Sequence, residues 1–438
     1  MDTRIRLVPT RIFPARIFVK DFGPVREADI DLRRMTILMG PNNTGKTFTT
    51  VLMLVLNRFI TDWGWRVVPL LSLFKRVKFT EVLQKLSENL LSDLVTLYSV
   101  GGPEELVRRG SDRAELRFVL RPEGDEFGDT LELEIRIHKP GAVFLRIPEF
   151  KELLKTKKYP TMKPLIYIPA ERAGIMRTYK QLLRLYIETR LYDVPPLLRI
   201  NRKRLAQFMM SEKLKLPGVV ETLLDRILEV DKFTLEERDR MFVAPALKLL
   251  EEGVLRGRLE MGEDLSVIYH ETGAEKPIDL INASSMVSEV SAIYLLSRML
   301  EKGRWLVIEE PEAHVHPRGQ MGLARFMAAL ARLGVNVIAT THSDLIALKL
   351  AQMVGLAGLR PEDRVKLGYR EDEYLTKEEL ALYFMEPAEN GSVARKVEVS
   401  ETGEVSELPT YSKVVEEMYG EAVKLLELHG KIPKISES

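Results

Sequence analysis

One short segment constrains the fold of this chain more than any other. Residues 35–47 read MTILMGPNNTGKT, a short apolar strand that runs directly into a glycine-rich loop. The loop has the pattern G-x-x-x-x-G-K-[ST] of a phosphate-binding loop, in which backbone N–H groups, a lysine and a hydroxyl meet phosphates and Mg²⁺. Residues 48–59 are largely apolar and lack proline, so a helix should begin there and direct its positive end at the phosphates. The residues expected to hold the phosphates are Gly40, Pro41, Asn42, Asn43, Thr44, Gly45, Lys46, Thr47 and Phe48.

A second segment, residues 305–317, reads WLVIEEPEAHVHP and places two acids after a strand. Its apolar residues predict a buried parallel strand, and Glu309 and Glu310 follow at the carboxyl end, where open α/β sheets bind ligands. Neighbouring residues of a strand point to opposite sides, so the two carboxylates can divide the tasks of holding Mg²⁺ and orienting water. The alternative interpretation is two surface glutamates after a core strand, and the phosphate-binding loop argues against it.

These motifs and their neighbours resemble the heads of ABC-type ATPases of the SMC/RecF/OLD group. The resemblance rests on IFVKDFGPVREADIDLRRMTILMGPNNTGKT (17–47), VIEEPEAHVHP (307–317) and YIPAERAG (167–174). It implies an α/β P-loop fold with an N-terminal antiparallel β-layer, split by a helical insertion. At residues 167–174 the beginning of a capped helix is an equally good interpretation.

The resemblance also implies a role for each candidate site residue. Glu309 takes the metal-side position, where Asp is usual and the longer Glu can reach Mg²⁺ through water, and Glu310 takes the catalytic-base position. His342 follows the predicted strand 335–340 and resembles the switch histidine that senses the γ-phosphate. Lys46, which reaches the β- and γ-phosphates as a cation, is the third candidate catalytic residue. Ser285 lies where the signature segment would contact ATP of a partner subunit, although Met286 replaces the expected glycine. A plain helix N-cap is the alternative there.

By pattern, the chain divides into three parts. Residues 1–172 form an ATPase lobe with the P-loop and a β-meander, residues 173–262 a helical insertion, and residues 263–438 a second ATPase lobe. Within the insertion, two helical stretches at 179–191 and 219–230 could form an antiparallel arm. The second lobe should end in a hairpin, with strands at 394–399 and 403–408, and a helix at 414–428.

The composition indicates in which compartment the protein is found. It has 438 residues with 45% hydrophobic residues, and no apolar run approaches the length of about 20 residues that a membrane span needs. It shows no signal peptide and contains no cysteine, which excludes disulfides and Cys-based zinc sites and predicts a cytoplasmic protein. The net charge of +1 gives no global bias toward nucleic acid.

The expected ligands are ATP and Mg²⁺, and the expected partners are a second copy of the chain, as a homodimer or larger homo-oligomer, and a separate effector protein. DNA or RNA binding would depend on a basic stretch, whose alternative interpretation is a solvated helix face paired with the acids that follow it. The stretch consists of Arg172, Arg177, Lys180, Arg184, Arg190, Arg199, Arg202, Lys203 and Arg204. Glu371-Asp372-Glu373 is not the Asp-x-Asp of a fused Toprim nuclease, so we expect a charged turn there and no nuclease.

Two functions remain open at this stage. One is an ATP-gated dimeric clamp in genome maintenance or anti-phage defence, and the other is an ATP-gated protein-assembly scaffold without a nucleic-acid role. A transporter ATPase is less favoured, because the signature segment is atypical and no membrane-coupling feature is present.

Overall fold

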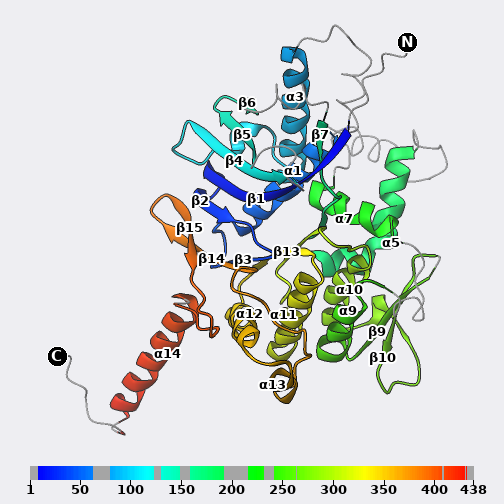
Figure 1. The fold of residues 1–438 in the computed structure, drawn as a ribbon, viewed down its shortest axis with the longest axis vertical. Coiled ribbons are helices and arrows are strands. Elements are labelled where there is room, and N and C mark those ends of the chain that lie inside the picture. The colour runs from blue at the N-terminus through cyan, green and yellow to red at the C-terminus, as the bar shows by residue number, and fades with distance from the viewer. Residues whose placement is uncertain are drawn as a thin grey trace.

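Most of the fold is one large mixed sheet with helices packed on both of its faces (Figure 1). The structure, a computed structural model, describes residues 8–62, 79–122, 130–147, 158–191, 216–230, 241–262, 264–406, 409–429 and 431. Among these residues, twelve strands join in a single sheet and three strands form a second, small sheet.

The strands of the large sheet are β1 (Val8–Phe22), β2 (Val25–Asp31), β3 (Met35–Met39), β4 (Arg113–Pro122), β5 (Leu131–His138), β6 (Ala142–Arg146), β7 (Lys158–Thr161), β8 (Ile166–Ile168), β12 (Trp305–Glu309), β13 (Asn336–Thr341), β14 (Leu380–Ala388) and β15 (Gly391–Val397). Their order is β6-β5-β4-β1-β2-β15-β14-β3-β13-β12-β8, with β7 paired to β1. The helices are α1 (Lys46–Asp62), α3 (Phe79–Tyr98), α5 (Arg172–Leu191), α7 (Gly218–Leu228), α9 (Ala244–Leu250), α10 (Ser285–Ser297), α11 (Pro317–Arg332), α12 (Asp344–Gly355), α13 (Pro361–Lys366) and α14 (Pro409–Leu428).

The centre of the sheet is parallel and buried on both faces. Strands β14, β3, β13, β12 and β8 are parallel neighbours, in that order. Every residue of β3 is buried, and so is every residue of β12 and β13, which is typical of strands covered on two sides. This confirms the strands predicted before the loop, before the paired acids and before His342, and it brings their carboxyl ends to one edge.

Alternate residues of these strands enter two separate cores. Ile37 and Ile308 pack with the side of the sheet that carries α5, α7 and α9 to α12, whereas Leu38 and Val307 pack with α1, α3 and the N-terminal strands. Because successive strand residues point to opposite faces, an uninterrupted apolar run is what such a two-sided sheet requires. The sheet therefore holds the loops at its edge between two rigid layers.

The N-terminal β-layer is antiparallel, as predicted. Strand β1 pairs with β2 and β4, and β4, β5 and β6 form the expected meander. The layer does not stand apart from the parallel centre, because β15 pairs with β2 on one side and with β14 on the other. One continuous sheet thus joins the antiparallel layer to the parallel centre.

The helices predicted for residues 173–262 pack into the same core as the parallel strands. Leu223 and Ile227 of α7 and Met176 of α5 belong to the cluster that also contains Ile308. The described parts of α5 and α7 therefore lie against the body of the molecule (Figure 1). The small sheet follows, with β9 (Gly257–Met261), β10 (Val267–Glu271) and β11 (Ile278–Asp279), of which β10 and β11 form a hairpin.

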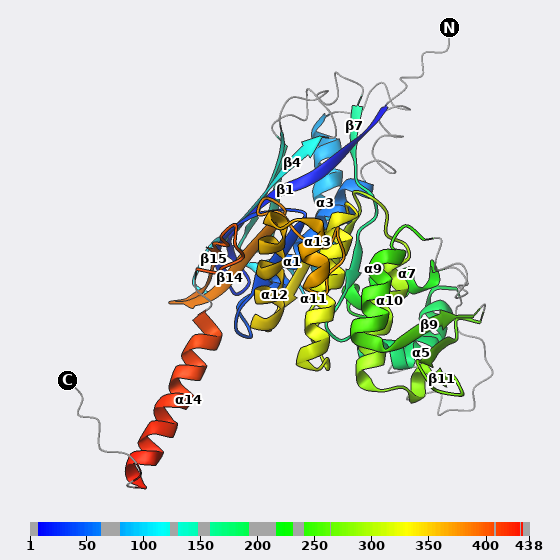
Figure 2. The same cartoon turned by 60° about the horizontal axis from the view of Figure 1, so that its bottom comes forward.

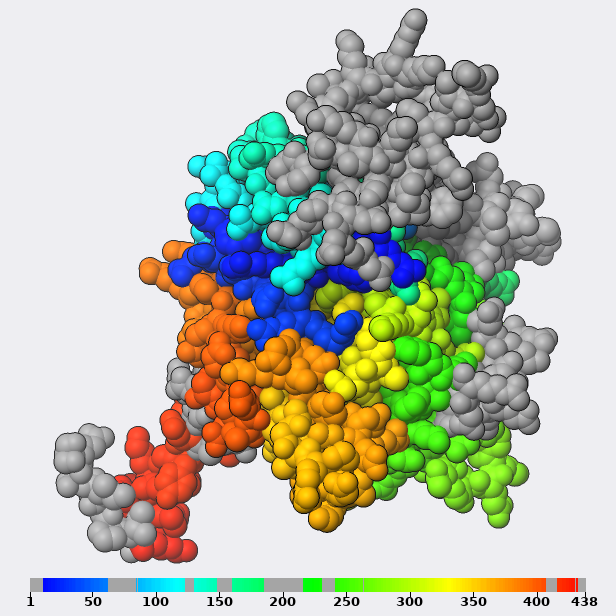
Figure 3. Space-filling view, in the orientation of Figure 1, coloured from blue at the N-terminus to red at the C-terminus, as the bar shows by residue number. Residues whose placement is uncertain are grey.

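The C-terminal hairpin predicted at 394–408 is wrong. The hairpin is formed by β14 and β15, with Ala388 paired to Gly391, while residues 399 and 405 share only an isolated bridge. The two-residue turn therefore consists of Glu389 and Asn390, and Asn390 has a left-handed φ of +60°, which asparagine tolerates. In the space-filling view, this orange segment adjoins the blue N-terminal strands (Figure 3).

The last helix lies apart from the rest. Helix α14, predicted at 414–428, extends away from the body in two views (Figures 1 and 2). Large apolar side chains such as Met418, Tyr419 and Leu428 are exposed on it. Among the described helices, none is both long and apolar enough to cross a membrane.

Candidate functional site

Three loops meet at the carboxyl edge of the parallel strands. The first follows β3, the second follows β13 and contains His342, and the third follows β12 and contains Glu310. Because β13 lies between β3 and β12, the phosphate-binding loop and the paired acids flank the histidine loop. Segments separated by more than 250 residues along the chain thus form one site.

The phosphate-binding loop is closed around its lysine. The Lys46 Nζ donates to the carbonyl oxygens of Gly40 at 2.9 Å and Pro41 at 2.7 Å, and its side chain is buried. Asn42, Asn43 and Thr47 are exposed on the outer surface of the loop. Burial lowers the pKa of Lys46 to about 8, and the nearby carboxylates of Glu310 and Glu312 oppose that effect.

Two glycines of this loop are required by its surroundings. Gly40 has φ +141° and a Cβ there would lie 2.6 Å from the carbonyl oxygen of Met385 on β14. Gly45 has φ +83° and its Cβ would lie 2.4 Å from Val25 Cγ2. The loop is therefore seated between the N-terminal layer and the C-terminal strand, so any larger residue would displace it.

Phe48, predicted to bind the cofactor, directs its ring into the core. The ring centroid lies 5.9 Å from that of Phe22 and 5.1 Å from that of Tyr98, and Tyr98 Oη donates to the Phe48 carbonyl at 2.6 Å. Only the backbone of Phe48 thus remains to approach a phosphate. Its ring instead anchors the first turn of α1.

Glu309 is buried and held by several donors. Tyr167 Oη donates to Oε1 at 2.6 Å, Thr50 Oγ1 donates to the same atom at 3.2 Å, and the Ala170 N–H donates to Oε2 at 3.2 Å. Burial raises the pKa of Glu309, and hydrogen bonds from Tyr167 and from the Thr47 hydroxyl oppose the rise. Tyr167 was not foreseen, although a hydroxyl inside the apolar run LIYIP was the available signal.

Glu310 faces the histidine and the lysine rather than the core. Its Oε1 lies 3.3 Å from His342 Nε2. The hydrogen bond with His342 lowers the pKa of Glu310, and the positive charges of Lys46 and Arg172 act in the same direction. The carboxylate is therefore ionised at neutral pH and can accept a hydrogen bond from water.

A third glutamate, which the sequence argument did not use, supports this arrangement. Glu312 Oε1 accepts from the backbone N–H of His342 at 2.6 Å and so ties the histidine loop to the loop after β12. Burial raises the pKa of Glu312. The repeated acids in EEPE were the signal that could have indicated a second acid in the site.

The signature-like segment forms the beginning of α10. Ser284 is the N-cap and its Oγ accepts from the Val287 N–H, which is the alternative left open for this segment. Ser285 is exposed on the first turn, and Arg177 Nη2 lies 3.4 Å from its Oγ. Arg177 also donates to Ser288 Oγ and to the Ala283 carbonyl, both at 3.1 Å.

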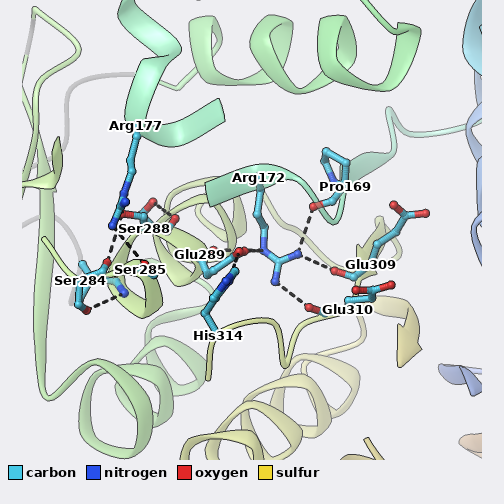
Figure 4. A network of polar contacts seen from close by, with 12 residues as sticks. Pro169, Arg172, Arg177, Ser284, Ser285, Ser288, Glu289, Glu309, Glu310 and His314 are labelled. Carbon is cyan, nitrogen blue, oxygen red and sulfur yellow. Dashed lines mark hydrogen bonds and ion pairs between the residues drawn. The ribbon is translucent and has the colours of Figure 1, made fainter. Parts of the chain in front are cut away.

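Arg172 was wrongly placed among the exposed basic residues. Its side chain is completely buried and contacts backbone carbonyls next to the paired acids, so it cannot contact a nucleic-acid backbone (Figure 4). Burial lowers the pKa of Arg172, opposed chiefly by Glu289. Arg177 is engaged with α10, and Lys180 pairs with Asp264. Residues Arg199, Arg202, Lys203 and Arg204 lie outside the described residues.

The acidic segment 371–373 is a turn, as predicted, but one of its residues is buried. Glu373 forms an ion pair with Arg325 of α11 and is almost completely buried. This pair connects the turn to the helix that follows the paired acids. It contacts none of the three loops described above.

Mg²⁺ fits the oxygen donors of the site, provided that phosphates complete its coordination. Thr47 and Glu309 supply a hydroxyl and a carboxylate, and the Thr47 hydroxyl is close enough to lower the pKa of Glu309. Among the residues that the structure describes, no group of three or more His, Asp or Glu side chains could enclose a metal ion alone. This suits Mg²⁺, which commonly uses one or two protein oxygens together with substrate phosphates.

The sheet order and the loops at its edge define the class of fold. A P-loop after β3, acids after β12 and an antiparallel layer joined to a parallel centre give this chain the predicted α/β P-loop fold. A protein-family model described as "AAA domain, putative AbiEii toxin, Type IV TA system" matches residues 177–348. The matched segment contains the paired acids and His342, and it begins after the P-loop.

Solved structures of similar fold include SMC head domains. An SMC head bound to the C-winged-helix domain of ScpA shows 11% identity and a TM-score of 0.43, covering 89% of this chain and 98% of that chain. An SMC head from Pyrococcus furiosus, with an extended coiled coil and bound to the C-terminal domain of ScpA, shows 11% identity and a TM-score of 0.45, covering 93% and 100%. The SMC head from Thermotoga maritima shows 11% identity and a TM-score of 0.41, covering 88% of this chain and 99% of that chain. No curated protein sequence matches the chain.

Proposed function

We propose that this chain binds ATP with Mg²⁺ and hydrolyses it to ADP and phosphate. One observation carries the proposal: Glu310 lies against His342, and the charges of both Glu310 and Glu312 act on Lys46 of the P-loop. Phosphoryl transfer to water needs a phosphate cradle, a metal-side carboxylate and a group that orients the water. The P-loop, Glu309 and Glu310 follow strands whose carboxyl ends share one edge of the sheet, and this supports the proposal.

Each residue then has a defined task. Backbone N–H groups of residues 42–47 cradle the phosphates, and Lys46 turns from the loop carbonyls to the β- and γ-phosphates. Thr47 and Glu309 hold Mg²⁺, which neutralises charge on the phosphate oxygens. Glu310 accepts a hydrogen bond from the attacking water, and His342 holds that carboxylate in place and reads the γ-phosphate.

Two substitutions test the ATPase. We expect Lys46→Ala to abolish ATP binding or turnover, because a neutral side chain leaves the phosphates without their cation. We expect Glu310→Gln to retain ATP but lower kcat by about 100-fold or more, because the amide cannot accept a proton from water. Phosphate release and fluorescent-nucleotide titration measure the two effects.

The matched control is Glu260→Gln on β9, which pairs with His270 on the surface and should hydrolyse ATP normally. Equal turnover in the wild type and Glu310→Gln would remove Glu310 from its role.

We further propose that two copies close on two ATP molecules, with Ser285 and the first turn of α10 contacting the partner's γ-phosphate, and that opening after hydrolysis controls a separate effector. The resemblance to SMC/OLD-like ATPases and the AbiEii description of the matched family support a role in genome maintenance or anti-phage defence. Gel filtration of Glu310→Gln with ATP should reveal a dimer that is lost in the Lys46→Ala variant.

A protein-assembly scaffold without nucleic acid is the second candidate. It is favoured because Arg172, Arg177 and Lys180 already form contacts within the chain. Salt-dependent binding to duplex DNA separates the two candidates, because contacts to phosphates weaken steeply as salt rises. The nucleic-acid role predicts binding that disappears when Arg199, Arg202, Lys203 and Arg204 become Glu. Absence of binding at low salt would favour the scaffold.

A further inference from the structure

Arg172 connects three elements that meet beside the paired acids. It is the first residue of α5, and its guanidinium reaches the end of β12 and the middle of α10 (Figure 4). Nη1 donates to the Glu309 carbonyl at 2.6 Å and to the Pro169 carbonyl at 3.1 Å, while Nη2 donates to the Glu310 carbonyl at 2.8 Å. Nε donates to the Glu289 carbonyl at 3.2 Å. A planar fork of donors suits such a set of carbonyls, and a lysine could not reproduce it.

The backbone that Arg172 contacts is strained. Glu310 has φ +43°, a left-handed conformation that non-glycine residues rarely adopt. Its N–H donates to the carbonyl of Thr340 at 3.0 Å and to the Thr340 hydroxyl at 3.2 Å, and its carbonyl accepts from Arg172. Such a conformation persists only where the surroundings fix it from several sides. Arg172 fixes the carbonyl side of this peptide and β13 fixes the amide side.

The chief counter-ion of the buried guanidinium is Glu289. Glu289 of α10 is almost completely buried, and its Oε2 lies 3.1 Å from Arg172 Nε. Its Oε1 lies 3.0 Å from Nδ1 of His314, whose side chain is 64% exposed. An unpaired buried charge is strongly unfavourable, so Glu289 determines where the guanidinium can lie. His314 in turn holds Glu289 from the solvent side.

We propose that Arg172 and Glu289 form a positioning pair that fixes Glu310 in its working conformation, with His314 orienting Glu289. The pair acts on the reaction through Glu310, so this inference rests on the proposed function. Glu289 lies one helical turn after Ser285 on α10, and Arg177 attaches the same helix start to α5. A shift of the first turn of α10 is therefore passed to Glu310 through Glu289 and Arg172.

Glu289→Gln tests the pair because it preserves the shape of the side chain and removes the counter-ion. We expect kcat to fall by about tenfold or more, since small displacements of a reacting group are costly in rate. We expect the Kd for ATP to change little, because neither residue contacts the P-loop. The matched control is Glu373→Gln, which removes an equally buried carboxylate from Arg325 away from the site and should preserve kcat.

A double-mutant cycle separates positioning from a merely structural role. In a Glu310→Gln background, single-turnover rates should fall little further on adding Glu289→Gln, because the base is already missing. If Glu289→Gln lowers the single-turnover rate by the same factor in the Glu310→Gln background as in the wild type, the proposal is overturned. Arg172→Lys should lower kcat as Glu289→Gln does, because a lysine keeps the charge but cannot donate to the same set of carbonyls.

If the buried variants do not fold, His314→Ala decides the question, since this side chain is largely exposed. We expect a decrease in kcat of about threefold at unchanged Kd, and an unchanged kcat would overturn the proposal. The outcome is distinct from failure of the ATPase proposal itself. If the ATPase proposal fails, Glu310→Gln hydrolyses ATP like the wild type. If only the positioning proposal fails, Glu310→Gln is slow, whereas the Glu289→Gln and His314→Ala variants hydrolyse ATP like the wild type.

Discussion

At the scale of single residues, Lys46 is subject to two opposing demands. In the proposed ATPase its charge attracts phosphates, yet its side chain is buried in the loop with its Nζ held by two carbonyl oxygens. Burial lowers its pKa to about 8, so a measurable fraction is neutral slightly above physiological pH. The carboxylates of Glu310 and Glu312 keep the amine charged below that value.

This balance predicts a pH dependence of ATP binding. Phosphates favour the charged amine and raise its pKa, so binding at pH 8 should be accompanied by proton uptake, and affinity should fall as pH rises through about 8 to about 9. Calorimetry at pH 8 in two buffers of different ionisation enthalpy measures the uptake. Identical heats in both buffers would contradict the prediction.

At the scale of elements, the C-terminal strands complete the P-loop. Strand β14 pairs with β3, and the Ser392 hydroxyl of β15 donates to the Thr44 carbonyl at 2.7 Å inside the loop. Ser392 is buried, so this hydrogen bond is shielded from water. A segment that follows the loop by more than 300 residues thus holds it in shape.

Ser392→Ala should therefore weaken ATP binding. Loss of one buried hydrogen bond costs about 1 kcal/mol, which corresponds to about fivefold in Kd if it acts on the nucleotide-competent loop. The control is Ser297→Ala in α10, whose hydroxyl donates only to the Ile293 carbonyl in its own helix. Nucleotide titration of both variants makes the comparison. An equal Kd for Ser392→Ala and the wild type would argue against this coupling.

At the scale of the whole molecule, one continuous sheet joins the antiparallel layer to the parallel centre, and α14 lies outside it (Figure 2). From Glu416 to His429, the side chains of α14 are exposed or half-buried. The cooperative unit should therefore include β14 and β15 and exclude α14.

Two truncations test this division. Deleting residues 409–438 should change Tm by less than about 2 °C and leave ATP binding intact, because the side chains of α14 that the structure describes, from Glu416 onward, bury little apolar surface. Truncation before Leu380 should abolish cooperative unfolding, because it removes β14 from the centre of the sheet. Thermal unfolding followed by circular dichroism checks both. A large loss of Tm in the first truncation would show that α14 docks on the body.

Much of the centre of the fold could be predicted from local patterns. Residues 35–39, 305–309 and 336–341 are strands within the predicted limits or one residue away, because uninterrupted apolar runs before a glycine-rich loop or paired acids have few alternatives. The hairpin of β14 and β15 was missed because the Thr402-Gly403 turn signal competed with Asn390-Gly391, and only pairing with β3 and β2 decides between them.

The candidate site shows the same limit. Lys46, Glu309, Glu310 and His342 were predicted from residue type and spacing, and the structure brings them to one edge. Arg172 and Glu289 carry no local signal of a role in this site, and the signal for Tyr167 was its hydroxyl inside the apolar run LIYIP. Their importance depends on contacts across 117 to 142 residues of sequence.

By itself the sequence determined the chemistry available to this protein: a phosphate cradle, two adjacent carboxylates and a histidine, each at the end of an apolar strand. Only the tertiary structure decided that an arginine in a basic stretch is a buried ligand of backbone carbonyls, and that the C-terminal strands belong to the P-loop. The reason is physical, since side-chain type and periodicity are local properties, whereas strand order and the pairing of buried charges are set by which distant segments pack together.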